Sequence, residues 1–221
     1  MFVRDIIIKD FPYLVPNDTG NKALDIMENY LIANLVVVNN DKVDGIVNMD
    51  DIYNFDLFDT RIEQFKNPIT KAYIYENMHI FDAIRAMTVF DLSVLPVINF
   101  ENFYVGTITF RSIIKHLSEI MPIRETGFYL MFSVPLIDYS PTEIANIIER
   151  NEAKLLTLYI NDHPNSSRLD VFVKVQTTDI GSVLSSFEKH KYEVTLLNPE
   201  RNDYDDMLQE RFDYLLNFLK I

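Results

Sequence analysis

The sequence predicts a mixed α/β (α+β) protein with two copies of a β–α–β–β–α unit followed by one β–α–β–β–α–β unit. Three observations support this fold class. Residues 13–39 align without a gap with residues 73–99, alternating apolar residues between 127 and 198 mark strands around two amphipathic helices, and a composition of 48% hydrophobic and 24% charged residues is that of a globular protein. The 221 residues also provide enough chain to bury a core in each part.

The repeat in the first half rests on identities at a constant spacing. At an offset of 60 the identical pairs are Tyr13/Tyr73, Asn17/Asn77, Ala23/Ala83, Met27/Met87, Leu35/Leu95, Val37/Val97 and Asn39/Asn99. One inserted residue then shifts the offset to 61 and brings Gly45-Ile46-Val47 onto Gly106-Thr107-Ile108. Because one copy is too small to bury both faces of its sheet, the two copies are expected to pack together.

Each copy shows the same elements in the same order. Apolar residues over 23–31 recur at helical spacing, and Asp18 or Thr19 can cap the start of this helix. The next elements of the first copy are a strand over 35–38, a polar turn over 39–41, a strand over 43–47 and a helix that begins within 49–55. The second copy repeats them as a helix over 80–91, a strand over 94–98, a turn over 99–102, a strand over 103–108 and a helix over 110–119.

The second half predicts a ferredoxin-like order of elements. Its first helix begins with the capping box Ser140-Pro141-Thr142-Glu143, which places Pro at the first helical position. The predicted elements are strands over 127–136, 156–160, 169–175 and 192–196, helices from 141 and from 180, and a loop over 161–167. The resulting β–α–β–β–α–β order is that of the ferredoxin-like fold.

Residues 199–221 are predicted to form a charged linker and an amphipathic helix. The apolar positions of this helix are Leu208, Phe212, Leu215, Leu216, Phe218 and Leu219. Its wide apolar face has to be covered by its own domain or by a partner chain, and packing within a dimer is the favoured interpretation.

The repeat resembles a tandem pair of cystathionine-β-synthase (CBS) domains, a Bateman module. The resemblance rests on Leu35-Val36-Val37-Val38 followed by Gly45–Ile52, and on Leu95-Pro96-Val97-Ile98 followed by Gly106–Thr109. It covers roughly residues 1–120, with one CBS domain expected over 1–65 and the other over 66–122. The resemblance implies a module with a pseudo-twofold axis and a cleft between the copies. Such clefts often bind adenosine-containing ligands such as AMP, ATP or S-adenosylmethionine.

The ligand pattern of that family is divided between the two copies. The pattern is Gly-x-x-Thr/Ser-x-x-Asp, in which the Asp accepts hydrogen bonds from the ribose hydroxyls and the Thr or Ser hydroxyl lies near the phosphate. Asp51 fills the Asp place of the first copy, where Asn48 replaces Thr. Thr109 fills the Thr place of the second copy, where Ser112 replaces Asp. A carboxylate suits two hydroxyl donors because it only accepts hydrogen bonds.

The resemblance therefore implies one nucleoside site that uses Asp51. Arg111 and Lys115 would lie near any phosphate, and the strand residues expected to line the adenine are Val36, Val38, Pro96 and Ile98. An alternative remains open, in which Asp51 and Thr109 only cap the helices that follow them. Arg111 alone is better explained as an exposed surface charge.

Because it follows a CBS pair, the unit over 127–198 resembles an ACT domain, a module that often binds amino acids and pairs with a second copy. The combination is similar to the acetoin-utilisation regulatory proteins. The ACT ligand loop usually contains Gly, whereas Asp138-Tyr139-Ser140-Pro141 has none. A structural or dimerisation role is therefore favoured over amino-acid binding.

Composition argues against several classes of function. The absence of Cys excludes disulfides, thiolate metal sites and a cysteine nucleophile. A net charge of −13 opposes nucleic-acid binding, and no run of 18 apolar residues indicates a membrane span. Five Gly leave little room for a phosphate loop, and the four histidines, His79, His116, His163 and His190, are scattered. Neither a catalytic site nor a metal site is predicted, and the expected location is the cytoplasm.

Two functions from different classes remain. In the first, the CBS pair binds an adenine nucleotide or S-adenosylmethionine and passes its state to a separate effector protein. In the second, the cleft has lost its ligand and the protein acts as a scaffold by dimerising. A homodimer is expected in both cases, and no cofactor is required in either. The sequence does not name the effector.

Overall fold

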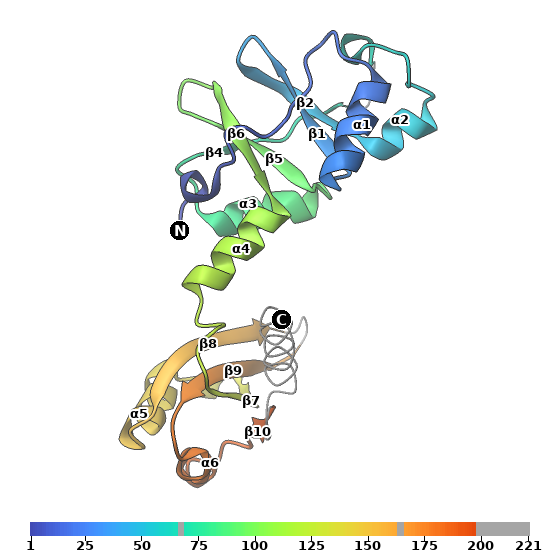
Figure 1. The fold of residues 1–221 in the computed structure, drawn as a ribbon. Coiled ribbons are helices and arrows are strands. Elements are labelled where there is room, and N and C mark those ends of the chain that lie inside the picture. The colour runs from blue at the N-terminus through green and yellow to red at the C-terminus, as the bar shows by residue number, and fades with distance from the viewer. Residues whose placement is uncertain (66–68, 163–165, 198–221) are drawn as a thin grey trace, which may run out of the picture. The chain divides into compact units, whose positions relative to one another are not determined.

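A computed structural model describes residues 1–65, 69–162 and 166–197 (Figure 1). The chain divides into two compact units between Met121 and Pro122. The first unit holds both repeats and the second holds the four-stranded sheet of the second half. The predicted tail over 199–221 and the loop residue His163 lie outside the described residues.

The first repeat consists of a three-stranded sheet and two helices. Its elements are α1 (Gly20–Tyr30), β1 (Asn34–Asn39), β2 (Lys42–Asn48), α2 (Met49–Asn54) and the short strand β3 (Ile69–Thr70). The strand order is β1-β2-β3, with both pairs antiparallel. Leu14 adds a parallel bridge to Val37, so the strand that opens the repeat is reduced to a single bridge. Thr19, one of the two predicted caps, accepts a hydrogen bond from the backbone N–H of Lys22 at the start of α1.

The second repeat has the same arrangement. Its elements are β4 (Ile74–Tyr75), α3 (Ile80–Val89), β5 (Val94–Ile98), β6 (Tyr104–Thr109) and α4 (Phe110–Ile120). The strand order is β4-β5-β6, with β4 and β5 parallel and β5 and β6 antiparallel. The predicted pair of β–α–β–β–α units is therefore confirmed. Helix α3 ends at Val89, two residues earlier than its periodicity predicts.

Each repeat completes its sheet with the segment that precedes the other repeat. Strand β3, which lies ahead of the second repeat, pairs with β2 of the first. Ile8, which lies ahead of the first repeat, forms an antiparallel bridge to Thr107 in β6 of the second. Gly106 permits this approach, because its φ is +142° and a Cβ there would lie 2.5 Å from Ile7 Cγ2 and 2.9 Å from Ile8 O.

The cores of the two repeats meet at their central strands. Strands β1 and β5 are in contact, and all five residues of β5 are buried. Val94 of the second repeat packs in the hydrophobic cluster of the first, while Ile46 of the first packs in the cluster of the second. Figure 1 shows α1 and α2 on the outer side of the first sheet and α3 and α4 beside the second. This exchange joins the repeats into one unit.

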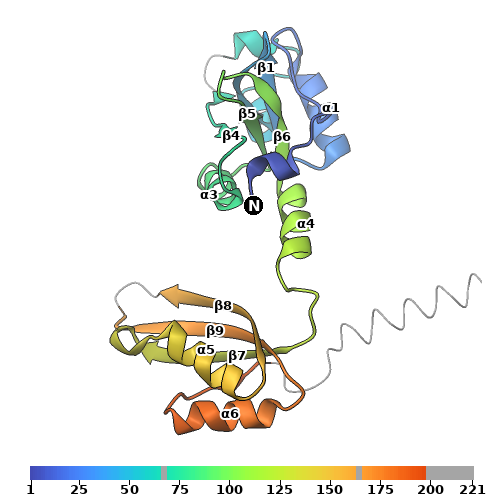
Figure 2. The same ribbon diagram turned by 90° about the vertical axis from the view of Figure 1, so that its left-hand side faces the viewer.

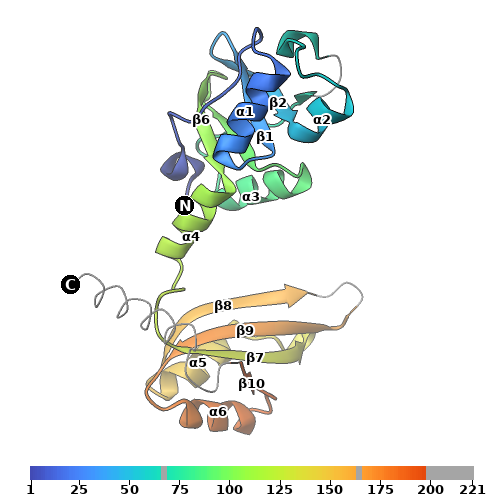
Figure 3. The same cartoon turned by 45° about the vertical axis from the view of Figure 1, so that its right-hand side comes forward.

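The second unit has one antiparallel sheet covered on one face. Its elements are β7 (Phe128–Pro135), α5 (Pro141–Arg150), β8 (Lys154–Asp162), β9 (Arg168–Gln176), α6 (Ile180–Lys189) and β10 (Thr195–Leu196). The strand order β10-β7-β9-β8 matches the predicted ferredoxin-like arrangement. Both helices pack on the same face of the sheet (Figures 2 and 3). The last strand has only two residues, whereas the alternation predicts one over 192–196.

Among the described residues of the second unit, a lysine is buried, contrary to the usual exposure of lysine. Lys174 in β9 is 4% exposed. Its Nζ donates hydrogen bonds to the carbonyls of Pro122 (2.7 Å) and Ile123 (3.3 Å) and lies 4.8 Å from the centre of the Tyr129 ring. The ammonium therefore ties the start of the second unit to its sheet. Among the described residues, no helix combines the length and the apolar content that crossing a membrane requires.

Candidate functional site

The best candidate site lies where β2 meets α2 in the first repeat. Asn48 ends the strand and is the N-cap of α2, but its side chain makes no capping hydrogen bond. Instead Asn48 Nδ2 donates a hydrogen bond to Asp51 Oδ2, and the two atoms are 3.0 Å apart. Asp51 is partly exposed in the first turn of the helix, and it does not cap that helix. The capping alternative is therefore wrong for Asp51.

A buried amide holds this pair in place. Asn34, at the start of β1, is 4% exposed, and its Nδ2 donates to Asn48 Oδ1. Asn34 Oδ1 accepts two further hydrogen bonds, from the backbone N of Ser93 at 2.7 Å and from Ser93 Oγ at 2.9 Å. Ser93 belongs to the second repeat. A continuous chain of hydrogen bonds thus runs from Asp51 through Asn48 and Asn34 into the other copy.

Sequence reasoning missed Asn34 and Ser93, although the alignment contains a signal for them. Asn34 stands opposite Val94 in the repeat, so a polar residue occupies one copy where the other has an apolar one. Ser93 stands opposite Ala33, whose backbone N–H donates to Ser93 Oγ over 3.1 Å. A polar residue at a buried position needs a partner, and here the partner is supplied by the opposite repeat.

The equivalent place in the second repeat is closed by local hydrogen bonds. Thr109 caps α4, because its Oγ1 accepts from the backbone N of Ser112 and Ser112 Oγ accepts from the backbone N of Thr109, both over 3.0 Å. The hydroxyls of both residues are thus occupied within one capping box. The capping alternative holds for Thr109. The structure brings Asn48 to Asp51 and Thr109 to Ser112, as two pairs in different repeats.

The residues expected to line an adenine are buried in this conformation. Val36, Val38 and Ile98 are 0%, 5% and 3% exposed, and Pro96 is also buried. Val36 and Val38 belong to the core cluster of the first repeat. Arg111 and Lys115, the two basic residues expected near a phosphate, are exposed on α4. Arg61 of the first repeat is also exposed, and its Nη1 lies 3.7 Å from Glu63 Oε1.

A tyrosine on the second sheet lies close to the first repeat. The backbone N of Tyr104 donates to the carbonyl of Asp41 over 2.8 Å, and its hydroxyl lies 2.8 Å from Thr107 Oγ1. Its ring meets that of Tyr13 edge to face, with the centroids 5.5 Å apart. Burial raises the pKa of Tyr104, an effect that the hydrogen bond to Thr107 partly offsets. The phenol is therefore protonated near neutral pH and acts as a structural link.

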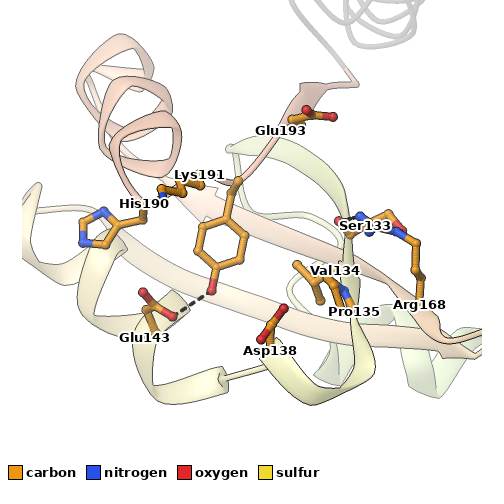
Figure 4. Close-up of a pocket in the computed structure, with 10 residues that line it drawn as sticks. Ser133, Val134, Pro135, Asp138, Glu143, Arg168, His190, Lys191 and Glu193 are labelled. Atoms are coloured by element: carbon orange, nitrogen blue, oxygen red, sulfur yellow. Dashed lines mark hydrogen bonds between the residues drawn. The ribbon is translucent and has the colours of Figure 1, made fainter.

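The second unit contains a separate cavity of about 630 Å³ (Figure 4). Its lining comprises Ser133, Val134, Pro135, Asp138, Glu143, Arg168, His190, Lys191, Tyr192 and Glu193. Tyr192 is 7% exposed and donates from its hydroxyl to Glu143 Oε2 over 3.0 Å. Burial, together with the hydrogen bond and the charge of Glu143, raises the pKa of Tyr192 to about 12.

The charges around this cavity are of both signs. Figure 4 shows the carboxylates of Asp138 and Glu143 in the lining of the cavity, and the charges of both raise the pKa of Tyr192. The Arg168 guanidinium is held by Ser133, with Nη2 2.6 Å from the carbonyl and Nε 3.2 Å from the hydroxyl. The cavity adjoins the segment 138–141, where the sequence places an ACT-like loop without glycine. The lining comes from four separate segments, so residue spacing gave no signal for it.

His79 and His190 each form a side-chain hydrogen bond with a backbone group. His79 Nδ1 accepts from the backbone N of Phe81 and caps α3, as its place near a helix start indicates. His190 Nδ1 lies 2.7 Å from the carbonyl of Ser186. Across residues 1–65, 69–162 and 166–197, no group of three or more His, Asp or Glu side chains is arranged to hold a metal ion.

Comparisons with known proteins agree with this architecture in the first unit. The CBS domain family matches residues 3–57 and again 64–119. An inosine-5′-monophosphate dehydrogenase from Methanocaldococcus jannaschii is 32% identical over 114 residues, which are 50% of this chain and 22% of the enzyme. An uncharacterised protein of the same archaeon is 29% identical over 123 residues, 54% of this chain and 40% of that protein. The chain thus spans less than half the length of these two relatives.

Solved structures with a similar fold cover about half of this chain. A CBS domain pair/ACT domain protein from Thermotoga maritima is 23% identical, covering 54% of this chain and 98% of that chain with a TM-score of 0.47. CBSX2 in complex with AMP is 16% identical, covering 54% of this chain and 97% of that chain, also with a TM-score of 0.47.

Proposed function

This chain belongs to the CBS domain family, with two CBS domains in tandem, and we propose that the pair binds an adenosine-containing ligand beside Asp51. A CBS pair is a regulatory module, so the binding event would control another process rather than a reaction on this chain. In this proposal the protein is not an enzyme and requires no cofactor. The ligand is of the AMP, ATP or S-adenosylmethionine type.

The state of the Asp51 carboxylate supports this proposal most directly. A carboxylate that caps its helix would have its acceptor capacity used by backbone N–H groups, whereas Asp51 makes no such bond. Asp51 Oδ2 accepts from Asn48, which leaves the side chain partly exposed with oxygen lone pairs available for two ribose hydroxyls. Asn48 fixes the direction of the carboxylate. In this proposal the buried Val36, Val38, Pro96 and Ile98 become accessible when the ligand enters between the repeats.

The hydrogen bonds between the repeats suggest how the ligand state would be transmitted. A ligand can change the protein only if it prefers one arrangement of the repeats over another. Asp51 is linked to Ser93 of the second repeat through Asn48 and Asn34, so a shift of Asp51 would reach the interface between the copies. The effector in this proposal is a separate protein, and the site of action is the cytoplasm.

We further propose that residues 127–198 are an ACT-like domain with a dimerising role, as in acetoin-utilisation regulators. The strand order β10-β7-β9-β8 supports the ferredoxin-like topology on which this comparison rests. The outer face of the sheet carries Tyr159 and Phe172 stacked with their centroids 4.8 Å apart, and Tyr159 is 53% exposed. An aromatic pair with one exposed ring, on a sheet face that no described helix covers, favours an interaction surface. The predicted homodimer would place it against a second copy.

A thermal-shift experiment on the full chain tests the ligand proposal. The panel is AMP, ADP, ATP, S-adenosylmethionine and NAD, each at millimolar concentration. A ligand at ten times its Kd stabilises the folded protein by about 1.4 kcal/mol. Asp51→Ala should abolish the shift. Asp25→Ala removes the same charge from an exposed position of α1 and should retain the shift. No shift with any compound would leave the alternative, a ligand-free scaffold that acts by dimerising.

A further inference from the structure

The two repeats differ sharply in charge. Residues 1–65 contain 5 Lys and Arg and 12 Asp and Glu, so 5 − 12 = −7. Residues 66–122 contain 5 of each, so 5 − 5 = 0. The first repeat therefore carries the whole net charge of the pair, and the candidate carboxylate Asp51 lies in that repeat. An anion approaching Asp51 meets a negative field, whereas the second repeat is neutral.

The same difference appears at the helix that borders the site. The first turn of α2 contains both Asp50 and Asp51, and the first turn of α4 contains no acidic residue. At the repeat offset of 61, Asp50 corresponds to Arg111. A helix N-terminus attracts negative charge, but at α2 two carboxylates already occupy that position. A phosphate placed there would face two like charges and no cation on the same turn.

The two repeats also differ at the position that the CBS ligand pattern places near a phosphate. Where the second repeat has the Thr109 hydroxyl, the first has Asn48, whose Oδ1 accepts from Asn34 and whose Nδ2 donates to Asp51. The amide thus orients the carboxylate, and no hydroxyl stands at this place. The ribose-binding group is therefore fixed by its neighbours, while the groups that would favour a phosphate are absent from the described turn of α2.

We infer that the Asp51 site selects adenosine-containing ligands whose 5′ substituent carries no net negative charge. This inference rests on the proposed function of that site and narrows its ligand class. The ribose hydroxyls of an uncharged nucleoside can donate to Asp51 without bringing an anion to Asp50. A cationic 5′ substituent, such as the sulfonium and ammonium groups of S-adenosylmethionine, would in addition be attracted by both carboxylates.

Isothermal titration of the full chain with three probes tests the inference. The probes are adenosine, AMP and S-adenosylmethionine, which share the adenosine group and differ in the charge at the 5′ end. The wild-type protein should bind adenosine and S-adenosylmethionine at least tenfold more tightly than AMP. That preference over AMP should shrink for S-adenosylmethionine as salt is added, because screening weakens attraction between exposed charges.

Two variants take their residues from the second repeat. Asp50→Arg should raise the affinity for AMP at least fivefold and leave the affinity for adenosine within twofold. Asn48→Thr also removes the amide that orients Asp51, so its readout is the ratio of the AMP affinity to the adenosine affinity, which should rise at least fivefold. Asp25→Arg, at an exposed position of α1, changes the net charge by the same amount as Asp50→Arg. It should leave the ratio of the AMP affinity to the adenosine affinity unchanged. Circular dichroism and thermal unfolding establish that each variant is folded.

The outcomes separate this inference from the proposed function. If the wild-type protein binds AMP as tightly as adenosine or more tightly, the inference is overturned and the proposed function stands. If Asp25→Arg changes the affinity ratio as much as Asp50→Arg, overall charge decides the preference and the site-specific inference is also overturned. If no probe binds to the wild-type protein or to the variants, the proposed function fails and the inference fails with it.

Discussion

Asn34 of the first repeat and Ser93 of the second are joined by two hydrogen bonds to a single oxygen. The backbone N of Ser93 lies 2.7 Å from Asn34 Oδ1, and Ser93 Oγ lies 2.9 Å from the same atom. The Asn34 side chain also donates to Asn48, so one buried amide links the candidate ligand site to the opposite copy. The contact breaks the symmetry of the repeat, because Val94 stands at the equivalent place.

Replacing this amide by the residue of the other copy should destabilise the first unit. In Asn34→Val, two buried donors on Ser93 and the oxygen of Asn48 lose their partner, and each unsatisfied group costs about 1–3 kcal/mol. Urea unfolding should show a loss of at least that size. Ser93→Ala should cost less, because its backbone N–H still donates to Asn34. An unfolding midpoint for Asn34→Val equal to that of the wild type would contradict the structural role of the amide.

Gly106 should not tolerate a side chain. At a φ of +142°, an L residue is strained, and its Cβ would lie 2.9 Å from the carbonyl oxygen of Ile8. We expect Gly106→Ala to lower the free energy of unfolding by roughly 1–3 kcal/mol, as for other strained backbone positions. Adding Ile7→Ala removes the 2.5 Å contact with Ile7 Cγ2 but leaves the backbone contact, so it should restore only part of the loss. Full recovery in the double variant would show that the backbone contact is unimportant.

The stability of the second unit should fall in strong alkali because of Tyr192. The reference pKa of a tyrosine is 10.0, and the pKa of Tyr192 in the folded protein is about 12. The folded state therefore holds the phenolic proton more tightly than the unfolded state does. The resulting stabilisation is fully present below pH 10 and disappears as the pH rises towards 12, with a slope of up to about 1.4 kcal/mol per pH unit. Denaturant unfolding at pH 9, 10 and 11 measures this slope.

Two variants at the same hydrogen bond separate its causes. Tyr192→Phe should remove this part of the alkaline slope, because it has no proton to lose. Glu143→Gln keeps an oxygen acceptor within reach but removes the negative charge, so the slope should still begin near pH 10 but end at a lower pH than in the wild type. A slope that is unchanged in Tyr192→Phe would show that other groups cause the alkaline loss.

Lys174 should protect the first residues of the second unit from proteolysis. Its ammonium binds the carbonyls of Pro122 and Ile123, the two residues that precede Arg124. Trypsin can cleave the peptide bond after Arg124. In Lys174→Met the apolar stem remains but both hydrogen bonds are lost, so cleavage after Arg124 should become several times faster. Lys189→Met, at an exposed position of α6, should leave that cleavage rate unchanged. Mass spectrometry of the digests identifies the bond cut.

The elements that the sequence predicted well have a clear period and a buried face. Strand β5 begins and ends where the apolar run over 94–98 does, and α4 extends one residue beyond its predicted end. Strands β3 and β10 have two residues each, which is too short for alternation to be visible. The pairing of these two strands depends on segments that are distant in sequence. The periodicity of apolar residues within a strand contains no information about those segments.

The candidate site could be predicted only in part. The resemblance to the CBS ligand pattern identified Asn48 and Asp51 in the first copy and Thr109 and Ser112 in the second, because the members of each pair are three residues apart in sequence. It did not separate capping from free side chains, because that depends on which hydroxyl or amide turns towards the backbone. Lys174 was missed for a similar reason. A lysine within an alternating strand indicates an exposed face, and its carbonyl partners lie about fifty residues earlier.

The exchange of sheet edges between the repeats has a consequence for how the chain reaches its folded state. Ile8 leaves the ribosome early, but Thr107, its partner in the second sheet, follows 99 residues later. Contacts of such long sequence separation form slowly, because the intervening chain has to be ordered first. The N-terminal segment can therefore pair only after β6 of the second copy has formed, and the sheet of the first copy is completed only when β3 pairs with β2. The two CBS repeats are therefore expected to complete their folding in a single cooperative step.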